Sequence, residues 1–272
     1  MTRPKKSLGQ NFLIDRNVAK KIVRTLELKR SDRVVEVGPG KGALTSFLLE
    51  ELDALTAIEI DDVLSASLRE KIGPNLKVIH RDVLEVDLPA LAGELGGKVR
   101  IVGNIPYNIT SPILFWIIDS SQHVDDCTLM MQREVAERLV AKPRTKEYGI
   151  LSIFAQYYAR PEFRFTVPAG AFQPPPEVVS AVISLDFRQR HSPPASDDSF
   201  FRLLVRSVFG QRRKTLRNGL RGMGIPAERL GQIPGDFNRR PEELTVSEFV
   251  ALADRLASVA SDLPLTLRGN RS

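Results

Sequence analysis

The chain has 272 residues, a formal net charge of +6, 42% hydrophobic residues and 26% charged residues. This composition is ordinary for a globular protein, and the length suffices for one large core and a smaller second unit. The longest apolar run, around ILFWII, is too short to span a bilayer, and the basic N-terminus MTRPKKSLGQNFL lacks the apolar segment of a secretory signal. We therefore expect a cytoplasmic protein that does not bind membranes.

Cysteine and histidine are sparse. Cys127 is the single cysteine, which excludes an intrachain disulfide. The three histidines, His80, His123 and His191, are not spaced like metal ligands, so we expect no metal site.

The positive charge is concentrated towards the C-terminus. Residues 181–272 carry 15 of the 39 Lys and Arg residues but only 10 of the 33 Asp and Glu residues. Within them, residues 199–227 contain seven basic residues and no acidic one. Such a stretch is typical either of a surface that binds a polyanion or of a solvated helical face, and charge alone favours neither.

In chain order, residues 15–29 show the apolar spacing of a helix, with Asp15 as its N-cap. Short apolar runs then alternate with helical segments, which favours a parallel sheet with helices on both faces. The expected strands are residues 33–37, 55–60, 75–80, 99–102 and 126–132, and the expected helices are 43–52, 63–72, 111–119 and 133–141. The periodicity of residues 150–159 and 178–187 does not distinguish strand from helix.

A polar, proline-rich segment over residues 188–199 is typical of a linker. After it, apolar residues recur at helical spacing up to about residue 260. We therefore predict an α/β domain over residues 1–187, a linker over 188–199 and a small all-helical domain over 200–272.

Gly38, Gly40 and Gly42 lie between the first sheet strand and the helix that follows it. Glycines allow a positive φ, and ligands of such sheets bind beyond the carboxyl ends of the strands. With Glu59, 21 residues after Gly38, to bind ribose hydroxyls, the loop fits a dinucleotide fingerprint. It fits a nucleoside such as S-adenosylmethionine equally well, and a tight turn without a ligand is the third interpretation.

Two further acids belong to this region. Asp82 follows the third strand, where a carboxylate either accepts from an adenine amino group or caps the next helical turn. Glu36 lies inside the first strand, where a buried acid needs a partner such as a ligand ammonium or backbone N–H groups.

The segment Asn104-Ile105-Pro106-Tyr107 follows the fourth strand. An exocyclic adenine amine is a poor nucleophile, because its lone pair is delocalised into the ring. An amide oxygen and a main-chain carbonyl that accept its two N–H groups would hold the nitrogen with the lone pair towards a methyl donor. Pro106 fixes the backbone and Tyr107 offers a face for a flipped base, so the segment favours the methyl donor over NAD.

The segment resembles the amine-binding motif of amino-methyltransferases, and the chain is similar to the family of small-subunit (16S) ribosomal RNA adenine N6,N6-dimethyltransferases. The similarity extends to about residue 256 and rests on LGQNFL (8–13), VVEVGPGKGALT (34–45), IEID (58–61), RDVLEVD (81–87), NIPYNITSPIL (104–114), MMQREVAERL (130–139), KEYGILSI (146–153), FQPPPEVVSAV (172–182) and FGQRRKTLRNGL (209–220). The resemblance implies a Rossmann-like S-adenosylmethionine-dependent methyltransferase sheet with a small all-helical C-terminal domain.

The resemblance also implies roles for single residues. The cofactor would be S-adenosyl-L-methionine, with Asn11 and Leu13 closing over it. Gly38 and Gly40 would pack against its amino-acid and ribose portions. Glu59 would bind the ribose hydroxyls, and Asp82 would bind the adenine amine. Asn104 would hold the target amine beside the methyl donor, the Pro106 region would supply a backbone contact, and Tyr107 and Phe172 would sandwich the target adenine. Arg81 departs from the family, which usually has Gly there, so the Asp82 role requires that residue 81 does not adopt a positive φ.

The implied reaction is methyl transfer to two adjacent adenosines in a loop near the 3′ end of 16S rRNA, within an immature small ribosomal subunit. The basic residues of the helical domain would bind phosphates, namely Arg212, Arg213, Lys214, Arg217 and Arg221, with Arg213, Arg217 and Arg221 on one helical face. We expect a monomer, since no apolar stripe suggests an obligate dimer. The alternatives are a macrolide-resistance enzyme that methylates one adenine of 23S rRNA, an RNA-binding assembly factor, and an NAD-dependent dehydrogenase.

Overall fold

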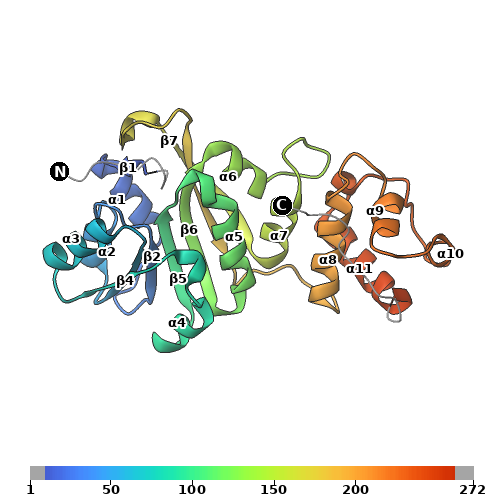
Figure 1. Ribbon diagram of the computed structural model, residues 1–272, viewed down its shortest axis with the longest axis horizontal. Coiled ribbons are helices and arrows are strands. Elements are labelled where there is room, and N and C mark those ends of the chain that lie inside the picture. Colours follow the sequence, from blue (N-terminus) through green and yellow to red (C-terminus); the bar gives the residue numbers. More distant parts are fainter. Residues whose placement is uncertain (1–9, 261–272) are drawn as a thin grey trace. The chain divides into compact units, whose positions relative to one another are not determined.

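The computed structural model describes residues 10–260, which divide into two compact units (Figure 1). The first unit comprises the chain up to residue 137 together with residues 158–189, and the second comprises residues 138–157 and the chain from residue 190 onward. The second unit thus includes residues 138–157, which the sequence analysis assigned to the α/β domain. The outermost parts of the predicted domains, residues 1–9 and 261–272, lie outside the described residues.

The first unit is built around a seven-stranded sheet with the order β4-β3-β2-β5-β6-β9-β7. The strands from β2 to β6 are parallel, as predicted, while β9 and β7 extend the sheet antiparallel at one edge. The strands are β2 (Val34–Val37), β3 (Leu55–Glu59), β4 (Leu76–His80), β5 (Val99–Asn104), β6 (Val124–Gln132), β7 (Arg160–Val167) and β9 (Ser180–Asp186). Every residue of β2 and β3 is buried, because a central parallel strand is covered on both faces.

Helices flank the sheet on both faces (Figure 1). They are α1 (Arg16–Thr25), α2 (Thr45–Glu51), α3 (Asp62–Ile72), α4 (Leu88–Glu94), α5 (Thr110–Asp119) and α6 (Arg133–Leu139). The predicted N-cap of α1 is confirmed, because the Asp15 carboxylate accepts from the N–H groups of Asn17 and Val18 at 2.8 and 3.2 Å. The apolar face of α1 packs with α2 in the main core of this unit.

A two-stranded antiparallel pair lies outside the main sheet. It joins β1 (Phe12–Leu13) to β8 (Phe172–Gln173), with Leu13 opposite Phe172. The pair fixes the segment before α1, and that segment becomes one wall of the pocket described below.

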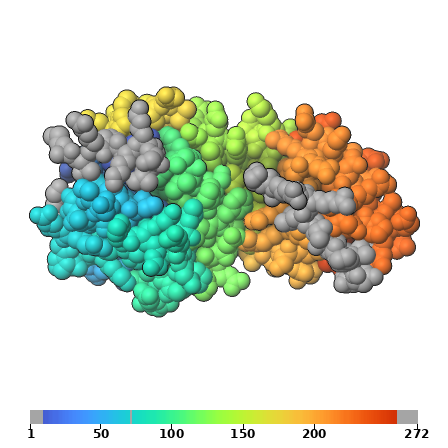
Figure 2. Space-filling view, viewed as in Figure 1, coloured from blue at the N-terminus to red at the C-terminus, as the bar shows by residue number. Residues whose placement is uncertain are grey.

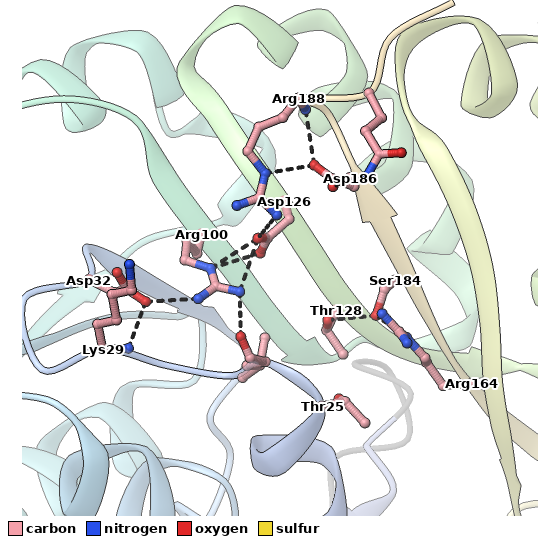
Figure 3. Close-up of polar contacts among 12 residues, drawn as sticks. Thr25, Lys29, Asp32, Arg100, Asp126, Thr128, Arg164, Ser184, Asp186 and Arg188 are labelled. Atoms are coloured by element: carbon pink, nitrogen blue, oxygen red, sulfur yellow. Dashed lines mark hydrogen bonds and ion pairs between the residues drawn. The ribbon is translucent and has the colours of Figure 1, made fainter.

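A largely buried ion-pair network lies near the amino ends of the parallel strands (Figure 3). The guanidinium of Arg100, at the start of β5, donates from Nε to Asp126 of β6 at 3.0 Å and from Nη1 to Asp32, before β2, at 2.8 Å. Arg188, after β9, reaches the same Asp126 carboxylate at 3.2 Å. The network therefore ties together four segments of the unit at the end of the sheet opposite its carboxyl edge.

The second unit is helical within its described residues. Its helices are α7 (Ile150–Tyr158), α8 (Asp198–Phe209), α9 (Leu216–Gly222), α10 (Ala227–Leu230) and α11 (Val246–Ala260). In its core, Tyr157 of α7 stacks on Phe201 of α8 with ring centroids 4.1 Å apart. Between β9 and α8, residues 187–197 form neither helix nor strand. Across residues 10–260, no helix is both long and apolar enough to cross a membrane.

Candidate active site

A cavity of about 240 Å³ lies at the carboxyl ends of β2, β3, β4 and β5. The strand order reverses between β2 and β5, and sheets of this type bind ligands at that position. Its walls come from residues 10–13, the glycine loop 36–41, the ends of β3 and β4, and the turn 104–109 after β5. The cavity brings together most of the predicted site residues, namely Asn11, Leu13, Gly38, Gly40, Glu59, Asp82, Asn104, Pro106 and Tyr107.

The glycine loop needs glycine for two reasons. Gly38, Gly40 and Gly42 have φ values of +65°, +59° and +83°, which other residues rarely adopt. In addition, a Cβ at Gly40 would lie 3.2 Å from the ring of Phe12. Phe12 therefore covers the loop, and the sequence analysis did not identify it because its role depends on a contact distant in sequence.

Glu59 shapes this loop from the end of β3. Its carboxylate accepts from the N–H of Gly40 at 3.0 Å and from the N–H of Asp61 at 2.9 Å. Burial raises the pKa of Glu59, and the hydrogen bonds from these two N–H groups oppose that rise. Each carboxylate oxygen keeps a further lone pair, so Glu59 can still accept from ribose hydroxyls.

Glu36 is a fully buried acid in the wall of the cavity, with 1% of its surface exposed. Its carboxyl accepts from the Thr45 hydroxyl at 2.7 Å. Burial raises the pKa of Glu36 to about 8, and the nearby charge of Glu59 adds to the rise. A cationic ligand group in the cavity would favour the ionised carboxylate.

The predicted capping role of Asp82 is confirmed, while its binding of an adenine amine stays a prediction. One carboxylate oxygen accepts from the N–H of Leu84 at 2.9 Å and so caps the helical turn 83–85, while the residue also lines the cavity. Arg81 is not among the residues with positive φ, and its N–H donates to the Glu59 carbonyl at 3.1 Å. Arginine therefore fits at this position without backbone strain.

Asn104 ends β5 and faces the N-terminal wall of the cavity. Its Nδ2 donates to the main-chain carbonyl of Asn11 at 3.0 Å. This bond orients the amide, and Oδ1 remains as its acceptor. Asn104 and Asn11, predicted from separate motifs, are thus direct neighbours.

The turn after Asn104 is held by the side chain of Thr110 and by the neighbouring strand β6. The Thr110 hydroxyl donates to the Pro106 carbonyl at 3.2 Å, and the Ile105 N–H donates to the Met130 carbonyl at 3.1 Å. Just before the turn, a Cβ at Gly103 would lie 2.5 Å from the Val37 carbonyl. Gly103, which the sequence analysis did not single out, therefore permits the close approach of β5 to β2 beside the cavity.

The two predicted stacking rings are in different environments. Tyr107 lines the cavity, and its hydroxyl is hydrogen-bonded to Ser180 at the start of β9. Burial raises the pKa of Tyr107. Phe172 is 2% exposed, belongs to the main core and does not line the cavity. The two rings therefore do not face each other across the cavity in this structure, as a sandwich of the target adenine would require.

The basic residues of the second unit are not arranged as predicted. α9 begins at Leu216, with Thr215 as its N-cap, because residues 211–214 form a turn. Arg213 therefore precedes the helix, and the prediction that it shares a helical face with Arg217 and Arg221 is wrong. Arg212 forms an ion pair with Glu242 at 2.7 Å.

Comparisons with known proteins identify the family of the chain. The chain matches the family model for ribosomal RNA adenine dimethylase over residues 1–256. It is 44% identical over 256 residues to Ribosomal RNA small subunit methyltransferase A of Acinetobacter baylyi, with 93% of each chain covered.

Two solved structures share the fold. The 23S rRNA methyltransferase ErmE is 28% identical, with a TM-score of 0.66 over 90% of this chain and 99% of that chain. A dimethyladenosine transferase from Plasmodium falciparum is 22% identical, with a TM-score of 0.72 over 94% of this chain and all of that chain.

The cavity fits S-adenosylmethionine, the methyl donor of this family. The positive-φ glycines allow close backbone contact, Glu59 offers acceptors for ribose hydroxyls, and the buried Glu36 carboxyl can bind a ligand cation. When bound, this cofactor supplies an activated methyl group. On the match of the family model to nearly the whole chain, and on a pocket built from the same motifs, the chain belongs to the ribosomal RNA adenine dimethylase family.

Proposed function

We propose that this chain dimethylates N6 of two adjacent adenosines in a loop near the 3′ end of 16S rRNA, during maturation of the small ribosomal subunit. The observation that carries the proposal is the Asn104 amide, oriented by the Asn11 carbonyl with its Oδ1 as the remaining acceptor at the cavity wall. An acceptor at this position suits an amine better than a hydride-transfer reaction.

Asn104 would act by holding the amine. Its Oδ1 would accept one N–H of the target, and a main-chain carbonyl of the Pro106 region would accept the other. With both N–H groups held, the nitrogen lone pair is directed at the methyl group. The nitrogen lone pair would take the methyl group, the donor sulfur would keep the electron pair of the broken C–S bond, and the nitrogen would lose its extra proton to solvent. Orientation supplies most of the catalysis, because the sulfonium is already activated.

The same geometry accounts for two transfers. After the first methylation the amine keeps one N–H, and one of the two acceptors is enough to hold it. After the second methylation no N–H remains, so the product loses its hydrogen bonds to the site. Tyr107 would stack on the base in both rounds, as single-stranded loop bases can be splayed onto an aromatic face.

The relatives favour the small-subunit target over the large-subunit alternative. Identity to the small-subunit enzyme of Acinetobacter baylyi is 44%, against 28% to the 23S enzyme ErmE. The decisive experiment incubates the protein and S-adenosylmethionine with small subunits that lack the modification and, in a separate reaction, with unmodified 23S rRNA, each followed by mass spectrometry of the rRNA. We expect two neighbouring dimethyladenosines. A single modified adenine in 23S rRNA would instead identify the macrolide-resistance activity.

We further propose a monomeric, cytoplasmic enzyme whose partner is the immature small subunit. The assembly-factor alternative predicts that a catalytically inactive variant still restores subunit maturation. The dehydrogenase alternative predicts that NAD binds in calorimetry, whereas we expect binding of S-adenosylmethionine alone.

A further inference from the structure

The loop before α7 carries three exposed basic side chains close together, Lys142, Arg144 and Lys146. Within residues 10–260 none of the three forms an ion pair, and the adjacent acid is Glu147. A basic loop is often only a solvated segment, so what matters is whether this loop has a fixed shape.

Arg212 attaches the loop to the helical core of the second unit. Its Nη2 donates to the carbonyls of Lys146 at 2.7 Å and Thr145 at 3.3 Å, and its Nε donates to the Glu242 carboxylate at 2.7 Å. The bond to Lys146 joins residues 66 positions apart in sequence. Two of the three guanidinium nitrogens of Arg212 are therefore directed at the protein itself.

Glu242 also binds the loop through its main chain. Its carbonyl accepts from the N–H of Arg144 at 2.7 Å, and Arg144 has a φ of +69°. A non-glycine residue keeps such a conformation only where its surroundings hold it. Next along the chain, the buried Tyr148 hydroxyl donates to the Leu244 carbonyl at 2.9 Å. The loop is thus anchored at successive points while its basic side chains stay exposed.

We propose that this loop and the turn beside Arg212 form one phosphate-binding surface for RNA, made of Lys142, Arg144, Lys146, Arg213 and Lys214. We assign Arg212 as the positioning residue that joins the two segments, in place of the phosphate contact expected from the sequence. In the space-filling view, the yellow-green surface of the loop segment adjoins the orange surface of the helical segment (Figure 2). Cations that are already ordered bind a polyanion without the cost of fixing a mobile loop. The identity of the polyanion rests on the proposed function.

The first test neutralises the loop. The variant combines Lys142→Ser, Arg144→Asn and Lys146→Ser, with asparagine at 144 because it tolerates positive φ. A matched control removes three exposed charges from the first unit through Lys29→Ser, Arg30→Asn and Lys98→Ser. Binding of a transcript of the 3′ region of 16S rRNA is measured over a series of salt concentrations.

We expect the loop variant to bind about tenfold more weakly or worse near 0.1 M salt, with the slope of log K against log salt reduced by about 2. The control variant should keep the wild-type affinity and the wild-type salt slope. A loop variant with the wild-type slope would overturn the proposal.

The second test asks whether Arg212 positions the loop or contacts phosphate directly. The two roles predict opposite changes in RNA affinity when Glu242 is replaced. Glu242→Ala removes a negative charge and releases Arg212, so a phosphate-binding Arg212 predicts tighter RNA binding. A positioning Arg212 predicts binding several-fold weaker and faster hydrogen exchange in residues 144–148. Glu228→Ala, which removes an exposed acid from α10, controls for the change of charge. If both variants tightened binding equally, Arg212 would not be a positioning residue.

These measurements are independent of methyl transfer. A wild-type chain that binds the transcript and leaves its adenines unmodified would contradict the proposed function and leave the surface standing. A wild-type chain that methylates, together with loop variants that keep the wild-type salt slope, would contradict the surface alone.

Discussion

The side-chain amide of Asn104 donates to the main-chain carbonyl of Asn11, 93 positions earlier in the chain. This bond makes the end of β5 and the N-terminal wall of the cavity one structural element. Because an amide has one oxygen, committing Nδ2 to Asn11 determines which atom faces an incoming amine. The bond also depends on the β1–β8 pair, which holds the N-terminal segment in place.

Asn104→Ala should therefore abolish the acceptor without removing the cofactor site. We expect methyl transfer to fall by about a hundredfold or more, the scale of losing one oriented hydrogen-bonding group in an active site. S-adenosylmethionine binding, followed by calorimetry, should change by only a few-fold. Asn17→Ala, on the exposed side of α1, removes an amide elsewhere and should leave activity unchanged. Full activity of Asn104→Ala would refute the proposed amine contact.

Gly40→Ala should weaken cofactor binding and lower stability together. Alanine is strained at a φ of +59°, and its Cβ would lie 3.2 Å from Phe12, which covers the loop. We expect a cost of about 1 kcal/mol or more in the free energy of unfolding. Gly93→Ala is the matched control, because Gly93 lies in α4 with open space around it. That change should stabilise the protein by about 0.5–1 kcal/mol, and equal effects at both sites would contradict the role of positive φ.

The parts of the fold that sequence predicts are those with a local pattern. β2, β3, β5 and β6 are largely buried and rich in apolar residues, and Asp15 marks the start of α1. β7 escapes prediction because it is an edge strand with the sequence RPEFRFTV, in which most positions are partly or fully exposed. β1 and β8 have two residues each, and their pairing depends on a partner distant in sequence.

The same distinction between local patterns and distant contacts holds for the residues of the site. Gly38, Gly40 and Glu59 belong to a recognisable loop pattern, and the structure places them around one cavity. Phe12 and Gly103 do not, because each is required by a contact with a distant segment. The partner of Arg212 could not be read from charge, since Glu242 lies thirty positions away and on another element.

Glu36 should make the stability of the ligand-free protein depend on pH. Burial raises the pKa of Glu36 to about 8, so the folded chain holds a proton that the unfolded chain releases at neutral pH. Its contribution to stability is therefore fully present below the unfolded pKa and is lost as the pH rises through about 8.

Glu36→Gln does not titrate, so its stability relative to wild type should rise between pH 5 and pH 9. Urea unfolding at a series of pH values measures the difference, with the exposed Glu51→Gln of α2 as control. A difference that stays constant across this range would show that Glu36 is ionised throughout.

Arg100→Leu should destabilise the first unit strongly. It leaves Asp126, whose side chain is 8% exposed, without its main partner, although burial already raises the pKa of that carboxyl. We expect a loss of about 3–5 kcal/mol in the free energy of unfolding. Arg30→Leu breaks an exposed pair with Asp53 and should cost at most about 1 kcal/mol. Adding Asp126→Leu to Arg100→Leu should recover part of the lost stability. No recovery would mean that the unpaired carboxylate of Asp126 is not the cause of the loss.

Substitution by leucine should have different effects at Tyr107 and at Phe172. Tyr107 lines the cavity, so Tyr107→Leu should lower kcat/KM for RNA, on the scale of about 1–3 kcal/mol for a base-stacking contact, with a small change in Tm. Phe172 is buried opposite Leu13, so Phe172→Leu should mainly lower Tm. Tyr107→Phe, which removes the bond to Ser180 and keeps the ring, should retain most activity if stacking is the function of Tyr107. If Phe172→Leu instead kept its Tm and lost activity, the ring would have to leave the core and stack on the base, as the family resemblance implies.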